Sequence, residues 1–426
     1  MTTPATQTHS SFDIEWVRAQ FPSLEQFVNG HLAAFLDAPA GTQAPQRVIA
    51  AVRDYFLLSN SNTRGEFQTS RRSDAILASA HAAIADLLHC DADEVSFGPN
   101  MTTLTFALAR AIGRELGPGD EVVVTLLDHD ANIAPWRTLQ ERGVVIRFVD
   151  IRPEDCTLDM NDLREKITSR TRLVAAGYAS NAVGSINRVE EIIRLAHKAG
   201  ALAFIDAVHY APHHSIDVRA LDCDFLACSP YKFFGPHMGC LYGQREHLLR
   251  LRPYKVRPAP DELPFRWETG TQIHEGLAGV AAAVDYLADL GRHCGVAAGA
   301  SRREAILAAY RAIQPYEMEL AARLISGLLE IPGVKFFGIS NPARFAERCP
   351  TVSIRLANRH PNEAARFLGD RGIFTWDGNF YALNLTERLG VEDQGGLLRI
   401  GVVHYNTAGE IDRLLEALRE FASAPA

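Results

Sequence analysis

Short apolar runs alternate with longer amphipathic stretches along the first two thirds of the chain. The runs are VSF at 95–97, EVVVTLL at 121–127, RLVAAG at 172–177, AFID at 203–206 and DFLAC at 224–228. Each reads as a buried strand, whereas VEEIIRLAHKAG at 189–200 has helical spacing. This alternation predicts an α/β fold with a mainly parallel sheet covered by helices on both faces.

The rhythm changes near Val296. A long helical pattern, REAILAAYRAIQPYEMELAARLISGLLE, leads into short strands and helices of a different spacing. We therefore expect a large domain at 36–295 and a smaller α+β domain formed by 1–35 and 296–426.

Composition narrows the possible functions. The 426 residues carry a net charge of -8, which argues against a nucleic-acid-binding surface. No apolar run is long enough to span a bilayer, and the start, MTTPATQTHSSFDIEW, does not read as a signal peptide. The 7 cysteines are scattered without a CxxC pair, which favours reduced thiols in a cytoplasmic protein over disulfides or a metal site.

Two residues indicate the chemistry. Asp206 ends the AFID run, and Lys232 lies among aromatic neighbours in SPYKFFGPH. A lysine in such surroundings is easily neutralised and can form a Schiff base. An aspartate at a strand end can hold the ring nitrogen of pyridoxal phosphate protonated. A surface lysine and a capping aspartate are the alternative.

These two residues occur together with the stretches FLDAPAGTQ near the start and RIGVVHYNTAGEIDRLLEAL near the end. In all of these features the chain resembles the class V aminotransferases of fold type I, and among them the cysteine desulfurase-like group. The resemblance covers nearly the whole chain. It implies an aspartate aminotransferase-like fold, pyridoxal 5'-phosphate as cofactor, and Lys232, His129, Asp206 and His209 as catalytic residues.

The resemblance also implies a set of cofactor contacts. Met101 and Thr102 begin a helix after the turn GPN, and such a helix start can bind a phosphate. His129 would stack on the pyridine ring, and Asn181 and His209 would bond its phenolic oxygen. A capped helix and a turn asparagine are the plainer interpretations. The other cofactor-binding candidates are Ser229, Tyr231, Gly270 and Thr271, with Tyr231 in place of a histidine of the family.

Substrate contacts follow in the same way. Arg399 matches the arginine that holds a substrate carboxylate, and Asp37 and Ala38 lie in a turn that lines the family's site. Arg64 matches an arginine at a dimer's active site, and Gly270 and Thr271 would reach the neighbouring subunit. The resemblance thus implies a homodimer with shared sites; a packing turn and a solvated loop arginine stay open for Asp37 and Arg64. His213 and His214 are expected to be exposed.

One family feature is missing from the sequence. Asn379, in GIFTWDGNFYALNLTERLG, falls about where desulfurases carry a mobile cysteine, and Cys349 is expected to lie on the wrong side of the domain. Without a thiol acceptor, we expect a β-elimination or decarboxylation lyase acting on an amino acid or a conjugate, including carbon-sulfur cleavage. A class V aminotransferase, an amino acid epimerase and a non-catalytic sulfur-transfer scaffold are the alternatives.

Overall fold

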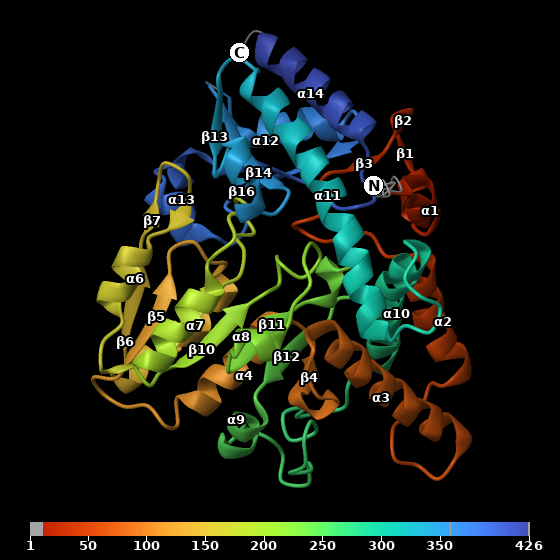
Figure 1. Cartoon of the computed structure of the whole chain (residues 1–426), viewed down its shortest axis with the longest axis vertical. Helices are drawn as coiled ribbons and strands as arrows, with labels where there is room; N and C mark the ends of the chain where they lie inside the picture. The colour runs from red at the N-terminus through yellow and green to blue at the C-terminus, as the bar shows by residue number, and fades with distance from the viewer. Residues whose placement is uncertain (1–11, 358, 425–426) are drawn as a thin grey trace, which may run out of the picture.

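The chain folds into two sheet-containing regions that share one long helix (Figure 1). The computed structural model describes residues 12–357 and 359–424. Within these ranges, no helix is both long enough and apolar enough to cross a bilayer. The expectation about a signal peptide concerns mainly residues 1–11, outside the described part, and the cytoplasmic location stays a prediction.

The larger sheet has seven strands in the order β4-β12-β11-β10-β9-β5-β6. Strand β12 runs antiparallel to both of its neighbours, β4 and β11, and the pairs from β11 to β6 are all parallel. The predicted mainly parallel sheet is therefore confirmed. Its strands are β4 (Val95–Gly98), β5 (Glu121–Thr125), β6 (Val145–Val149), β9 (Thr171–Gly177), β10 (Leu202–Asp206), β11 (Phe225–Cys228) and β12 (Gly239–Gly243).

Helices bury both faces of this sheet. Successive residues of β10 point to opposite sides: Phe204 packs in the cluster that contains Leu108 of α4 (Met101–Ile112), and Ile205 packs in the cluster that contains Val280 of α10 (His274–His293). A strand covered on both faces must be apolar throughout, which explains the continuous AFID run. The carboxyl ends of the parallel strands are left as the accessible edge.

The smaller sheet is antiparallel, in the order β13-β14-β17-β16. Figure 1 shows it at the top of the molecule beside α14. The long helix α11 (Arg302–Leu329) joins the two regions, because Ile313 packs in the large core and Leu324 in the small one. The other elements are β13 (Val334–Phe337), β14 (Thr351–Leu356), β16 (Trp376–Gly378), β17 (Leu397–Gly401), α12 (Pro361–Gly369) and α14 (Ala408–Ser423).

The N-terminal segment contacts both regions, because Val17 and Phe21 pack in the large core and Leu36 in the small one. Helix α1 (Ile14–Ala19) is short and ends before Pro22, which starts a separate 3₁₀ turn. The division into domains at 36 and 295 stays a prediction. The remaining helices and strands are β1 (Phe27–Val28), β2 (His31–Leu32), β3 (Ala34–Phe35), α2 (Gln46–Leu58), α3 (Gln68–Leu88), α5 (Ala134–Arg137), β7 (Ile151–Arg152), β8 (Thr157–Leu158), α6 (Met160–Lys166), α7 (Val189–Lys198), α8 (Val218–Leu221), α9 (Arg245–Arg250), β15 (Ile373–Phe374) and α13 (Leu383–Arg388).

Candidate active site

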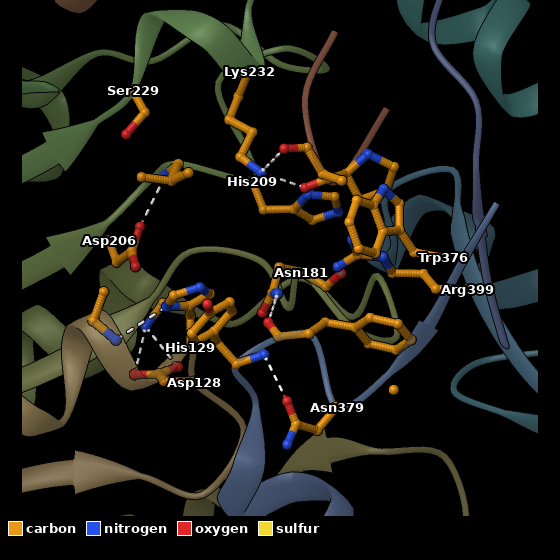
Figure 2. A pocket seen from close by; sticks show the side chains of 18 of the residues that line it. Asp128, His129, Asn181, Asp206, His209, Ser229, Lys232, Trp376, Asn379 and Arg399 are labelled. Atoms are coloured by element: carbon orange, nitrogen blue, oxygen red, sulfur yellow. Dashed lines mark hydrogen bonds between the residues drawn. The ribbon is translucent and has the colours of Figure 1, made fainter. Parts of the chain in front are cut away.

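A cavity of about 670 Å³ lies where the carboxyl ends of the parallel strands meet residues 379–381, the segment after β16. Most of the residues singled out from the sequence line it (Figure 2). These are Met101, Thr102, His129, Asn181, Asp206, His209, Ser229, Tyr231, Lys232, Asn379 and Arg399.

Lys232 is a buried amine in this cavity. It ends the 3₁₀ turn that follows β11, and its Nζ donates hydrogen bonds to the carbonyl oxygens of Pro39 and, at 2.9 Å, Ala40. Burial, with help from the positive charge of Arg399, lowers its pKa to about 7. Near neutral pH a large fraction of this amine is therefore unprotonated and nucleophilic.

Two buried carboxyl groups face the cavity from the carboxyl ends of β10 and β5, the strands on either side of β9. Asp206 ends β10 and accepts a hydrogen bond of 2.9 Å from the Val208 N–H, and burial raises its pKa to about 6. Asp128 follows β5 and accepts a hydrogen bond of 2.9 Å from the Gly177 N–H; burial, together with the nearby charge of Asp206, raises its pKa to about 7. Either carboxylate would be stabilised by a cationic or N–H partner in the cavity.

His129 presents a neutral ring to the cavity. Its Nδ1 accepts a hydrogen bond of 3.0 Å from the Ala131 N–H, and burial, followed by the charges of Lys232 and Arg399, lowers its pKa to about 4. Tyr381 stacks on this ring, with centroids 5.4 Å apart and planes at 24°. The imidazole plane is thereby fixed as part of the cavity wall.

The N-terminus of α4 opens onto the same cavity. Asn100 caps the helix by accepting a hydrogen bond of 2.8 Å from the Thr103 N–H, which leaves the N–H groups of Met101 and Thr102 without an intrahelical partner. Strand β12 passes so close that a Cβ on Gly239 would lie 2.4 Å from the Met101 nitrogen. The glycine lets this helix end approach the sheet, where it forms a cradle for an anion.

Polar atoms without partners also lie at this cavity. The side-chain amide of Asn181 donates a hydrogen bond of 2.9 Å to the Phe380 carbonyl, while its Oδ1 is buried without a hydrogen-bond partner. The Nε2 of His209 is likewise buried and unpartnered. Because buried polar atoms normally have partners, these two indicate that the cavity is built for a bound polar molecule or ion.

Arg399 brings a positive charge from the small sheet. It lies in β17 and donates a hydrogen bond of 2.9 Å to the Asn181 carbonyl. The central carbon of its guanidinium lies 4.2 Å from the centroid of the Phe380 ring. Burial lowers its pKa to about 9, against the opposing effect of Asp37. Asp37 itself does not line the cavity; its Oδ1 is buried without a partner, and burial raises its pKa to about 6. Ala38 is buried beside it.

The segment after β16 is anchored to the large sheet. The Asp130 N–H donates a hydrogen bond of 2.7 Å to the Tyr381 carbonyl. The backbone φ angles of Phe380 and Tyr381 are positive, at 57° and 58°. Such backbone angles are unfavourable and persist only where surrounding contacts impose them. The Asn379 side-chain amide donates a 3.0 Å hydrogen bond to Glu392, which also lines the cavity. Within the described residues, no cysteine lines the cavity.

Three of the expected site residues lie elsewhere in the single chain. Arg64, Gly270 and Thr271 line a second cavity of about 500 Å³, and Arg64 stands 4.7 Å over the ring of Phe265. The structure therefore does not bring them to Lys232 within one chain.

Some residues of the cavity were not expected from the sequence, and two others were expected at different places. Asp128 and Tyr381 were not expected in the site; the strand-end position of Asp128 was a usable signal, but no local pattern marks Tyr381. The expected exposure of His213 is wrong, because it is 2% exposed. The expected placement of Cys349 is also wrong: it is buried within 4.8 Å of a ring nitrogen of His209.

Comparison with known proteins agrees with this geometry. The family model Aminotransferase class-V matches residues 34–414. A cysteine desulfurase of Dickeya dadantii (strain 3937) is 33% identical, with 96% of each chain aligned, and an aminotransferase-like protein of Gibberella zeae is 32% identical over 96% of this chain and 98% of its own. The apo structure of a cysteine desulfurase from Thermococcus onnurineus NA1 superposes with a TM-score of 0.84 at 26% identity, covering 99% of both chains.

Proposed function

The chain belongs to the class V aminotransferase family, and from that premise we propose a lyase that cleaves a bond at the β carbon of an amino acid or an amino acid conjugate without a thiol acceptor. Members of this family are pyridoxal phosphate-dependent enzymes, and this chain is one of them. The reaction type and the role of each residue are the proposal.

The cavity fits pyridoxal phosphate. The cradle at Met101 and Thr102, with Ser229 on the lining, would hold the phosphate. Asp206 would accept the ring N–H, and the unpartnered Oδ1 of Asn181 is a polar atom at the same site.

When bound, this cofactor withdraws electrons from the α carbon of a substrate, so that bonds at the α and β carbons can break. The buried amine of Lys232 would bind the aldehyde carbon and afterwards carry the α-proton, because a pKa of about 7 suits both proton uptake and release. The ionised Asp206 would keep the ring nitrogen protonated. His129, held neutral and flat by Tyr381, would cover one face of the ring.

Arg399 favours an amino acid as substrate. Its guanidinium is fixed by Phe380 and the Asn181 carbonyl and keeps donors free for a carboxylate. Figure 2 shows Lys232 pointing between Asp206 on one side and Arg399 with Trp376 on the other. A substrate whose carboxylate is bound to Arg399 would thus present its amino group toward Lys232.

The observation that carries the reaction type is the anchored segment after β16. The hydrogen bonds from Asp130 to Tyr381 and from Asn181 to Phe380 fix this segment to the cavity wall, and no cysteine lines the described part of the cavity. Sulfur transfer to an enzyme thiol needs a nucleophile that can reach the substrate. Leaving groups that depart without attack, such as a β-sulfinate, a β-carboxylate or a thiolate, need none.

We also propose a homodimer with shared active sites. Arg64, Gly270 and Thr271 line a cavity separate from that of Lys232, so a second chain is needed for them to take part. The end of α2 exposes Phe56, Leu57 and Leu58, of which Leu57 is 70% exposed. Neighbouring exposed apolar side chains of this kind favour a protein interface.

The test is a substrate panel on the holoenzyme: cysteine, cysteine sulfinate, aspartate and S-substituted cysteines, scored for pyruvate, alanine, sulfide and keto acid. We expect pyruvate or alanine from substrates whose β leaving group departs without attack by an enzyme thiol. A keto acid together with the pyridoxamine form would replace the proposal with transamination, and loss of optical rotation alone would replace it with epimerisation. Sulfide and alanine released from free cysteine at the rate of the sulfinate would overturn the argument from the missing thiol.

A further inference from the structure

Behind the wall of the cavity lies a cluster of two histidines and a cysteine that the proposed reaction does not use. One ligand atom from each of His209, His213 and Cys349 lies within 4.8 Å of the other two, and all three residues are buried. We propose that these three side chains bind one borderline-soft divalent cation of the zinc type. The proposal is independent of the reaction at Lys232.

The donor set decides the class of cation. A thiolate and two imidazoles suit Zn²⁺ or Co²⁺, whereas Mg²⁺ and Ca²⁺ prefer oxygen ligands. The ligand atoms, which lie within 4.8 Å of one another, would move closer on binding, because the ligand atoms of one tetrahedral Zn²⁺ are about 3.3–3.8 Å apart. Three protein ligands leave a fourth position for water or another small ligand.

The free ring nitrogens are consistent with ligation. The Nδ1 of His213 lies 2.7 Å from Oε2 of Glu317, which leaves its Nε2 as the ligand atom. A carboxylate behind a histidine is the usual outer partner of a metal ligand, because it fixes the ring and its tautomer. The Nε2 of His209 is buried and has no hydrogen-bond partner, so it is available as a second ligand atom.

Charge balance supports a cation rather than an empty cluster. Glu317 is 2% exposed, and its Oε1 has no hydrogen-bond partner. Nearby, His404 is fully buried with an unpartnered Nδ1, which lies 3.8 Å from that oxygen. A divalent cation would balance one carboxylate and the thiolate formed when Cys349 loses its proton to solvent on binding, whereas unbalanced buried charge is costly.

The site would also act on the cofactor cavity. His209 belongs to both the cluster and the cavity lining. With Nε2 on the cation, its other nitrogen must carry the proton and can only donate. The cation would thereby fix the tautomer of a residue in the cavity wall.

No local sequence pattern predicts this site. His209 and His213 follow β10, whereas Cys349 precedes β14 in the other sheet-containing region. The scattered cysteines therefore led to the expectation of no metal, which rested on the absence of a CxxC pair.

The test measures metal in the full-length protein. The metal content of wild type purified without chelators is measured by inductively coupled plasma mass spectrometry, and chelator-treated wild type is titrated with CoCl₂. We expect about one equivalent of zinc or cobalt per chain, visible absorption bands of tetrahedral Co²⁺, and a melting temperature that rises with added Zn²⁺. The Lys232→Ala variant, without bound cofactor, should hold the same equivalent.

Variants assign the ligands. Cys349→Ser and His213→Ala should lose the bound cation, and Glu317→Gln should weaken cobalt binding by about 10- to 100-fold. Cys223→Ser, a change at another fully buried cysteine, is the matched control and should keep it. Wild type that takes up no stoichiometric Zn²⁺ or Co²⁺ overturns the proposal and leaves His213 and Glu317 as a buried hydrogen-bonded pair. Folded Cys349→Ser that binds cobalt as tightly as wild type would also overturn it.

Discussion

Tyr381 stacks on His129 with ring centroids 5.4 Å apart, so a residue next to the small sheet completes the cavity wall of the large one. The 2.7 Å hydrogen bond from Asp130 to the Tyr381 carbonyl makes the same connection through the backbone. The cavity therefore depends on how the two regions dock, and four predictions follow from its geometry.

Removing the Tyr381 ring should loosen the cofactor. An aromatic pair contributes about 0.5–1.5 kcal/mol, so Tyr381→Ala should weaken pyridoxal phosphate binding by about 2- to 10-fold. Tyr381→Phe keeps the stacking and is the matched control. Equilibrium titration of cofactor-free protein by absorbance measures the effect; equal affinity of the alanine variant and wild type would contradict a holding role for the ring.

Lys232→Ala should abolish the yellow absorbance band and lower turnover by at least about a thousandfold, because no other lysine in the described part of the chain lines the cavity. Lys198→Ala, at the end of α7, is the control and should keep both. Spectra and initial rates check this. A variant that keeps both the yellow band and wild-type turnover would show that the assignment of Lys232 is wrong.

Cofactor capture should depend on pH through the Lys232 amine. Burial lowers the pKa of this amine to about 7, so the neutral, reactive fraction increases as pH rises. The capture rate of cofactor-free protein should rise about tenfold per pH unit below pH about 7 and level off above it. Stopped-flow absorbance gives the profile. A rate that keeps rising toward the ordinary lysine pKa of about 10.4 would exclude the buried amine.

Arg399→Lys should raise KM for the amino acid by about 10- to 100-fold, because a lysine cannot reproduce a two-point hydrogen bond to a carboxylate. The turnover number should change less, since the guanidinium holds the substrate and not the reacting bond. Arg388→Lys, in a surface ion pair with Asp150, is the control and should leave KM unchanged. An unchanged KM in Arg399→Lys would remove this residue from substrate binding.

The sequence by itself determined the sheet and most of the strand-end residues of the site. Buried parallel strands must be continuously apolar, so their positions could be read directly, and their carboxyl ends share one edge. That rule predicted Met101, Thr102, His129, Asn181 and Asp206 at one edge, and all five line the same cavity.

Only the tertiary structure decided which parts of the smaller region meet this edge. The stacking of Tyr381 on His129, the position of Phe380 under Arg399 and the approach of Cys349 to His209 join segments far apart in the chain. Hydrophobic periodicity reports which face of an element is buried and not which other element covers it, because that choice depends on how two cores dock.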